Sequence, residues 1–233
     1  MGLAVAYDFD GVLVDSYSCL PIVYRLVADR IGVVGKNVFV ESMLYLEDLM
    51  DYYGVWDRRE WWRFLVRNSG MLAGVDIDSI VDLYWSLRIR YSHVMPNATC
   101  VLERLNNMGI DLYIVSGMDD TVEGKIRRIR ESGLTRYFRD VIVYGVYGEF
   151  KDVRQALSYL VDQCGSRQIY YVDDKIVNLN RLAKLGINLV NYLYRPPYPR
   201  AFAWTVEPAG DYMTIYDHLD LVRFLDRVVG SVD

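Results

Sequence analysis

The sequence contains few cysteines, and they lie far apart. Only Cys19, Cys100 and Cys164 occur in 233 residues, and no two of them have the spacing of a metal-ligand pair or a redox dithiol. An odd number of separated thiols excludes a complete disulfide framework, and we interpret them as buried thiols. A chain of this length buries enough apolar surface to fold without a cross-link or a structural metal.

Long hydrophobic runs and an excess of positive charge are also missing. No apolar stretch reaches the ~20 residues that a membrane-spanning helix requires, and the segment before Asp8 is too short for a signal peptide. The formal net charge is -5 and the pI is about 5.1. Such a chain is a poor electrostatic match for nucleic acid or an anionic membrane. We therefore expect a cytoplasmic protein that binds neither.

Strands are missing from one long part of the chain, and the rest alternates between strands and helices. From Ser16 to about His93 the pattern is helical, with helices expected at 20–31, 38–53, 57–67 and 78–92. Strands are expected at 3–7, 112–115, 141–144, 169–172 and 187–190, with helices at 98–108, 121–131, 152–162, 177–185 and 218–228 and an extended loop at 195–200. Alternation of this kind predicts an α/β fold with a parallel sheet and helices on both faces.

We therefore expect a Rossmann-like core made of residues 1–15 and 95–233, with an all-helical cap inserted at 16–94. Sites in such sheets lie beyond the carboxyl ends of the strands. Candidate site residues follow the strands: Asp8 and Asp10, then Ser116 and Gly117, then Lys151, then Asp173 and Asp174. Carboxylates gathered in one crevice repel one another unless a cation binds there.

Four motifs carry a resemblance to a known family. They are Asp8-Phe9-Asp10-Gly11-Val12-Leu13-Val14-Asp15-Ser16, then Ser116 at a strand end, then Lys151, then Asp173-Asp174. In this order they resemble the haloacid dehalogenase superfamily, in its phosphatase branch with a helical cap inserted after the first strand, similar to phosphoglycolate phosphatase and beta-phosphoglucomutase. Asn178 departs from the pattern, because many relatives carry a second acid there.

The resemblance implies a Mg²⁺-dependent phosphomonoester hydrolase. A phosphoryl dianion repels an attacking carboxylate, so the site must neutralise charge. The family pattern implies that Asp8 is the nucleophile and forms an aspartyl-phosphate, and that Asp10 is the general acid and base. The implied Mg²⁺ ligands are the Asp8 carboxylate, the Asp10 backbone carbonyl and Asp174, with Asp173 binding directly or through water. The implied groups that hold the phosphoryl oxygens are Ser116, Lys151 and backbone N–H groups near Gly11 and Gly117.

Several alternatives remain open. A phosphomutase passes the phosphoryl group to a sugar, and a non-catalytic Mg²⁺-binding module would act through its cap and aromatic surface, although the complete motif set argues against such a module. Asp10 disfavours a dehalogenase, whose reaction needs no acid there, and the only cap lysine, Lys36, gives a phosphonatase little support. Lys125 and Lys175 are rivals of Lys151 for the cationic role.

We expect the substrate to be a small phosphorylated metabolite such as a sugar phosphate or phosphoglycolate. The aromatic stretch at 52–62 is expected to pack within the cap, with a face over the substrate or a homodimer contact as the alternatives. Arg58, Arg59 and Arg63 are expected to form a solvated helix face. His93 and His218 are expected to be structural or exposed.

Overall fold

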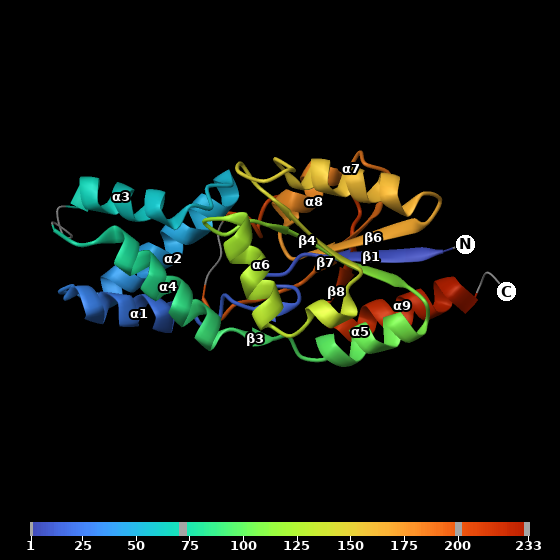
Figure 1. Cartoon of the computed structure of the whole chain (residues 1–233), viewed down its shortest axis with the longest axis horizontal. Helices are drawn as coiled ribbons and strands as arrows, with labels where there is room; N and C mark the ends of the chain where they lie inside the picture. The colour runs from blue at the N-terminus through green and yellow to red at the C-terminus, as the bar shows by residue number, and fades with distance from the viewer. Residues whose placement is uncertain (1, 70–73, 199–201, 231–233) are drawn as a thin grey trace.

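The computed structural model describes residues 2–69, 74–198 and 202–230, and Figure 1 shows a helical part beside a sheet part. The described residues form one parallel sheet in the order β5-β4-β1-β6-β7-β8. Its strands are β1 (Leu3–Tyr7), β4 (Asp111–Gly117), β5 (Asp140–Tyr144), β6 (Gln168–Asp173), β7 (Asn188–Tyr192) and β8 (Met213–Ile215). β1 lies between β4 and β6, so the carboxyl ends of these three strands meet at one edge.

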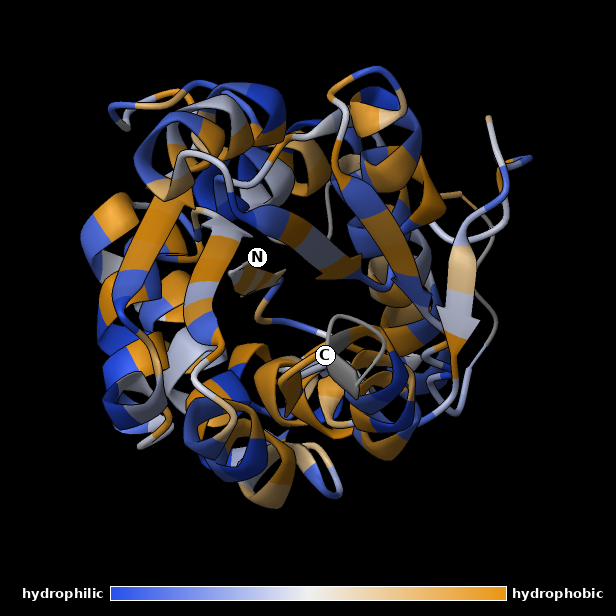
Figure 2. Cartoon of the chain, turned by 90° about the vertical axis from the view of Figure 1, so that its right-hand side faces the viewer, coloured by the Kyte–Doolittle hydropathy of each residue, from blue (hydrophilic) through white to orange (hydrophobic). Residues whose placement is uncertain are grey.

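Helices cover both faces of the sheet (Figure 1). One face carries α5 (Ala98–Asn107), α6 (Val122–Glu131) and α9 (His218–Gly230), and the other carries α7 (Val153–Cys164) and α8 (Ile176–Leu182). Successive strand residues point to opposite faces. In β1, Val5 and Tyr7 pack into the first layer, and Ala4 and Ala6 pack into the second. This two-sided burial explains why the strand reads as a continuous apolar run, and Figure 2 shows hydrophobic colour along the inner strands.

The helical part has a core of its own. It contains α1 (Leu20–Ile31), α2 (Lys36–Tyr53), α3 (Arg58–Ser69) and α4 (Ile77–Tyr91). Trp61, Trp62, Tyr24 and Tyr84 are buried between these helices. The helical part joins the sheet part through a two-stranded antiparallel ribbon of β2 (Val14–Asp15) and β3 (His93–Val94). We call this helical part the cap.

The α/β fold with a parallel sheet is confirmed, and every strand and helix predicted from the sequence is present with ends shifted by a few residues. Three strands were not predicted. β2 and β3 have two residues each and β8 has three, so none is long enough to display a period. The described part of the expected loop, residues 195–198, has no regular structure, and residues 199 and 200 lie outside the described residues. No described helix is long and apolar enough to cross a membrane.

Candidate active site

Asp8 lies at the carboxyl end of β1, where two neighbouring strands fix it. Its backbone N–H donates to the Val172 carbonyl at 2.8 Å, and its Oδ1 accepts a hydrogen bond from the Ser116 hydroxyl at 2.6 Å. Burial raises the pKa of Asp8 to about 7, with a further rise from Asp173, although Lys175, Lys125 and the Ser116 hydrogen bond pull it down. Without a cation, Asp8 is therefore easily protonated, and a bound cation would keep it ionised.

The turn after Asp8 brings two acidic segments unusually close. Gly11 has φ 80°, in the left-handed region that favours glycine. A Cβ at this position would overlap the carboxylate of Asp174 and the ring of Tyr17. Gly11 N–H also donates to the Val14 carbonyl at 2.8 Å, which closes the turn. Glycine is therefore needed here both for the backbone angle and for the approach to Asp174.

Asp8, Asp173 and Asp174 form a buried acidic cluster. Each offers a carboxylate oxygen, and these atoms lie within 4.8 Å of one another. Burial raises the pKa of Asp173 and raises that of Asp174 well above its ordinary value. Three close carboxylates with such pKa shifts favour a bound cation. An oxygen-only ligand set of this kind fits Mg²⁺.

Asp173 and Asp174 differ in the hydrogen bonds that their carboxylates accept. Asp173 accepts from the Lys175 backbone N–H at 2.8 Å, from Tyr171 OH at 2.7 Å and from Asn178 Nδ2 at 3.0 Å, so both of its oxygens are engaged. Asp174 Oδ2 accepts from the Trp204 indole N–H at 2.6 Å. Its Oδ1 is buried and has no hydrogen-bond partner among the described residues. Asp174 Oδ1 is therefore available to a metal, and Asn178 acts on Asp173 as a hydrogen-bond donor.

Lys151 does not lie in this pocket, so its expected placement is wrong. Its side chain is exposed, and Nζ donates to the carbonyls of Val146 at 3.2 Å and Gly148 at 2.9 Å. The loop before it folds back on itself, since Gly145 N–H donates to the Phe150 carbonyl at 2.8 Å. The ammonium group is therefore bound by carbonyls of its own loop.

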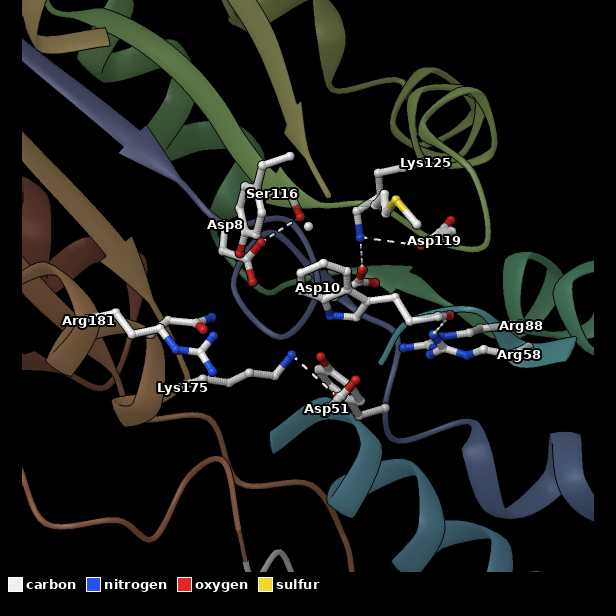
Figure 3. Close-up of a pocket in the computed structure, with 16 residues that line it drawn as sticks. Asp8, Asp10, Asp51, Arg58, Arg88, Ser116, Asp119, Lys125, Lys175 and Arg181 are labelled. Atoms are coloured by element: carbon white, nitrogen blue, oxygen red, sulfur yellow. Dashed lines mark hydrogen bonds and ion pairs between the residues drawn. The ribbon is translucent and has the colours of Figure 1, made fainter. Parts of the chain in front are cut away.

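Lys175 lies in the pocket in which Lys151 was expected to supply the positive charge. It lines the pocket with Asp8, and its Nζ lies 3.4 Å from Asp51 Oδ2 of α2 (Figure 3). Burial lowers the pKa of Lys175, but the attraction of Asp51, Asp174, Asp8 and Asp173 outweighs burial and raises it. Lys175 is therefore a permanent cation between the cap and the acidic cluster.

Asp10 is held by two cations from α6. Lys125 Nζ bonds Asp10 Oδ2, and Arg128 Nη2 bonds Asp10 Oδ1 at 2.7 Å. The same two side chains reach Asp119, which lies 3.5 Å from Lys125 Nζ and 2.9 Å from Arg128 Nε. Burial raises the pKa of Asp10, but Arg128, Lys125 and Arg88 outweigh burial and hold it well below its usual range. In this conformation Asp10 is an ionised carboxylate, which suits a general base.

The cap supplies the opposite wall of the pocket. Arg58 and Arg88 enter from one side in Figure 3, and Lys175 and Arg181 enter from the other. The full lining is Asp8, Asp10, Tyr17, Asp51, Trp56, Arg58, Arg88, Ser116, Gly117, Met118, Asp119, Lys125, Tyr144, Lys175, Asn178 and Arg181. The free volume is about 40 Å³, which holds only a few water molecules.

Arg58 differs from the expected solvated helix face. It is 4% exposed, and its backbone N–H donates to Asp120 Oδ1 at 2.8 Å, which anchors the start of α3 on the sheet part. Arg88 was not singled out from the sequence, although one signal was present. It follows Val81 and Tyr84 at helical spacing on the buried face of α4, and a charged residue on an apolar stripe is a candidate for function.

A segment near the C-terminus completes the site. Trp204, which bonds Asp174, also packs edge-on against Tyr17 of the cap with ring centroids 5.4 Å apart. Phe202 N–H donates to Asp48 Oδ2 of α2 at 3.2 Å, and its ring lies 5.4 Å from that of Tyr45. The 202–204 segment therefore contacts both the acidic cluster and the cap, and no local sequence pattern indicated this.

The structure thus brings together most of the residues predicted from the sequence. Asp8, Asp10, Ser116 and Gly117 line one pocket, and Asp173 and Asp174 adjoin it through Asp8. The family model of the haloacid dehalogenase-like hydrolases matches residues 3–186 of this chain. None of the curated proteins compared with it is significantly similar.

Solved structures share the fold over nearly the whole chain. The HAD-hydrolase YfnB from Bacillus subtilis, described as bound to magnesium and as showing interdomain movement, is 17% identical over 96% of this chain and 98% of its own, with a TM-score of 0.69. A predicted phosphoglycolate phosphatase from Haemophilus somnus is 14% identical over 96% and 98%, with a TM-score of 0.64. An L-2-haloacid dehalogenase from Xanthobacter autotrophicus, with chloropropionic acid covalently bound, is 14% identical over 97% and 99%, with a TM-score of 0.68.

Proposed function

Because this chain belongs to the haloacid dehalogenase-like hydrolases, we propose that it is a Mg²⁺-dependent phosphatase that hydrolyses a small phosphorylated metabolite through an aspartyl-phosphate on Asp8. The observation that carries the proposal is the buried cluster of Asp8, Asp173 and Asp174, in which Asp174 Oδ1 has no hydrogen-bond partner among the described residues. A divalent cation bound there would offset the negative charge of both these carboxylates and the phosphoryl group.

In this proposal Asp8, Asp174 and the Asp10 backbone carbonyl would hold Mg²⁺. Asp173 orients its neighbours, since both of its oxygens already accept hydrogen bonds. Bound Mg²⁺ would offset the charge of the phosphoryl oxygens and keep Asp8 ionised.

The protein's own groups carry the proposed steps. A carboxylate oxygen of Asp8 attacks phosphorus, and the bond between phosphorus and the leaving oxygen breaks. Ser116, which lies 2.6 Å from Asp8 Oδ1, and Lys175 hold the phosphoryl oxygens. Asp10 protonates the leaving oxygen and later removes a proton from the water that hydrolyses the intermediate. Its ionised form in this structure suits the second step, and the first step requires Asp10 to gain a proton and loosen its bonds to α6.

The test is release of inorganic phosphate from a panel of phosphorylated metabolites, measured with Mg²⁺ and with excess chelator. We expect turnover only with the metal, and we expect Asp8→Asn to abolish it while circular dichroism shows an intact fold. Full activity in chelator, or wild-type turnover by a homogeneous Asp8→Asn preparation, would contradict the proposal.

The small free volume of the pocket favours one second candidate, a phosphomutase of the same fold. Transfer of the phosphoryl group to a sugar hydroxyl requires that water be kept out. A mutase would isomerise a sugar phosphate with little release of inorganic phosphate, so measuring both products separates the two activities.

A further inference from the structure

Two arginines are buried in the cap wall of the pocket. Arg58 is 4% exposed and Arg88 is 2% exposed, and both line the same pocket as Asp8. Figure 3 shows their guanidinium groups side by side, across the pocket from Lys175. A guanidinium group keeps its charge even when buried, so each one needs a compensating anion.

A single carboxylate within the cap serves both arginines. Glu47 is fully buried, and its Oε1 lies 2.9 Å from Arg88 Nη1 and 3.3 Å from Arg58 Nη2. Its Oε2 accepts hydrogen bonds from the hydroxyls of Tyr24 and Tyr84. One negative charge therefore faces two positive charges.

Two other carboxylates that line the pocket, Asp10 and Asp51, form ion pairs with other cations. Asp10 is bonded by Lys125 and Arg128, and Asp51 faces Lys175. Asp120 accepts the backbone N–H of Arg58 and lies 3.5 Å from Arg59 Nη1. Among the described residues, Glu47 is the carboxylate that forms ion pairs with these two guanidinium groups, and it is shared between them.

Both guanidinium groups also have an unused hydrogen-bond donor and lie near aromatic rings. Their Nε atoms are buried and have no hydrogen-bond partner among the described residues. Arg58 Cζ lies 3.9 Å from the ring centroid of Trp61, and Arg88 Cζ lies 5.3 Å from that of Tyr17. Cation–π contacts at these distances help to hold the guanidinium groups, which can bind a carboxylate or a phosphoryl group through two parallel hydrogen bonds.

We propose that Arg58 and Arg88 form a second anion subsite, which binds an anionic group on the leaving-group side of the substrate. The proposal rests on the proposed phosphatase function. The transferred phosphoryl group lies at Asp8, Ser116 and Lys175, and the leaving alcohol extends toward the cap. The substrate class is therefore a phosphomonoester whose alcohol bears a carboxylate or a second phosphoryl group. A neutral alcohol would give the buried Nε donors of both arginines no anionic partner.

The test compares matched substrates on the wild-type enzyme with Mg²⁺. The first pair is 2-phosphoglycolate and 2-hydroxyethyl phosphate, and the second is 1,3-propanediol bisphosphate and 3-hydroxypropyl phosphate. We expect the anionic member of at least one pair to have a kcat/KM roughly 10²-fold or more above its neutral partner, because a site with buried donors rejects an analogue that leaves them unpaired. The preferred pair identifies the anion as a carboxylate or a phosphoryl group.

Single substitutions test whether Arg58 and Arg88 cause the preference for the anionic substrate. Arg58→Gln and Arg88→Gln should each lower the ratio of kcat/KM between the anionic and neutral members at least tenfold, mainly through KM, and Arg58→Lys should restore part of it. Arg63→Gln is the matched control, since Arg63 lies on the same helix and bonds Glu60 on the surface. It should leave the ratio unchanged. If Arg88→Gln is unstable because Glu47 loses a partner, the double variant Glu47→Gln, Arg88→Gln replaces it.

The outcomes that would overturn the anion subsite differ from the outcome that would overturn the phosphatase activity. Turnover of p-nitrophenyl phosphate with no preference in either pair would overturn the subsite and leave the phosphatase intact. No turnover of any phosphomonoester would overturn the phosphatase itself. A preference that persists in both arginine variants would also overturn the assignment to Arg58 and Arg88.

Discussion

Asp8 and Asp10 lie two residues apart and have opposite electrostatic surroundings. The pKa of Asp8 is raised to about 7, and the pKa of Asp10 is held well below its usual range. An acid with a raised pKa destabilises the fold as the pH rises from its unfolded value, ~3.8, through its folded value. An acid with a lowered pKa stabilises the fold above its unfolded value and loses that contribution as the pH falls through its folded value.

The first prediction follows for Asp8 in the metal-free protein. Asp8→Asn should raise the melting temperature at pH 8, because it removes an unfavourable buried charge, and the gain should shrink as the pH falls below about 7 toward 4. Saturating Mg²⁺ should stabilise the wild type more than this variant. Calorimetry from pH 4 to 8 in chelator and in Mg²⁺ measures both effects, and a gain that is independent of pH would contradict the raised pKa.

Asp10 gives the second prediction, with the opposite sign. Asp10→Asn leaves Lys125 and Arg128 with Asp119 as their remaining carboxylate partner. Breaking a buried ion pair from one side typically costs on the order of 3 kcal/mol. Urea denaturation at pH 7 should show a loss of this order, in contrast to the gain for Asp8→Asn. Equal stability of the two variants would show that the cations on α6 do not hold Asp10 in solution.

Lys175 and Lys151 give the third prediction. Lys175→Gln should lower kcat/KM for p-nitrophenyl phosphate roughly 10²- to 10³-fold, the usual effect of losing a group that stabilises developing negative charge. Lys151→Gln should change it less than about threefold, because Lys151 is exposed and bonds only its own loop. The reverse ranking would restore Lys151 to the role that the family pattern implies.

At the scale of single elements, the turn that follows β1 gives the fourth prediction. Gly11→Ala should weaken Mg²⁺ binding at least tenfold, because the added Cβ would displace the Asp174 carboxylate. Gly32→Ala is the matched control, since Gly32 also has positive φ, 71°, but its Cβ would meet nothing within 4 Å. The control should lose only about 1–2 kcal/mol of stability. Isothermal titration with Mg²⁺ measures the difference, and equal affinities would contradict the proposed metal position.

The sequence predicted the helices and strands of the fold, but it predicted only part of the residues that form the site. Apolar runs and helical periods identify strands such as Leu3–Tyr7 and helices such as Leu20–Ile31, because burial imposes the period directly. Asp8, Ser116 and Asp174 could be predicted because parallel strands deliver their ends to one edge. Lys175, Arg58 and Trp204 depend on how the cap and the last loop pack onto that edge, and no local pattern encodes such packing.

At the scale of the whole molecule, the cap and the sheet part meet in a closed arrangement. Asp120 alone accepts from Arg58 N–H at 2.8 Å and from the Trp85 indole at 2.6 Å, and it lies 3.5 Å from Arg59 Nη1. The free volume of about 40 Å³ is too small for a phosphorylated metabolite, so substrate entry requires the cap to move. The β2–β3 ribbon, which joins the two parts, is the natural hinge.

The fifth prediction tests this closure. Asp120→Ala removes three cap contacts without touching the acidic cluster, so the open state should gain population. We expect a larger radius of gyration in small-angle X-ray scattering and a several-fold weaker inhibition by orthophosphate. Asp111→Ala is a suitable control, because Asp111 pairs with Arg139 and Arg167 far from the cap. An unchanged scattering profile for Asp120→Ala would argue that other contacts, such as Lys175 with Asp51, hold the cap.

The 202–204 segment also bears on the order in which the site is built during synthesis. The acidic cluster is complete once Asp174 has been translated, but its indole donor arrives only with Trp204, beyond the 3–186 region that the family shares. A nascent chain that ends before Trp204 already holds Asp8, Asp173 and Asp174, without the hydrogen bond that fixes Asp174. It also lacks the Phe202 contact to α2. Trp204 and Phe202 are therefore the last of these contact residues to be synthesised.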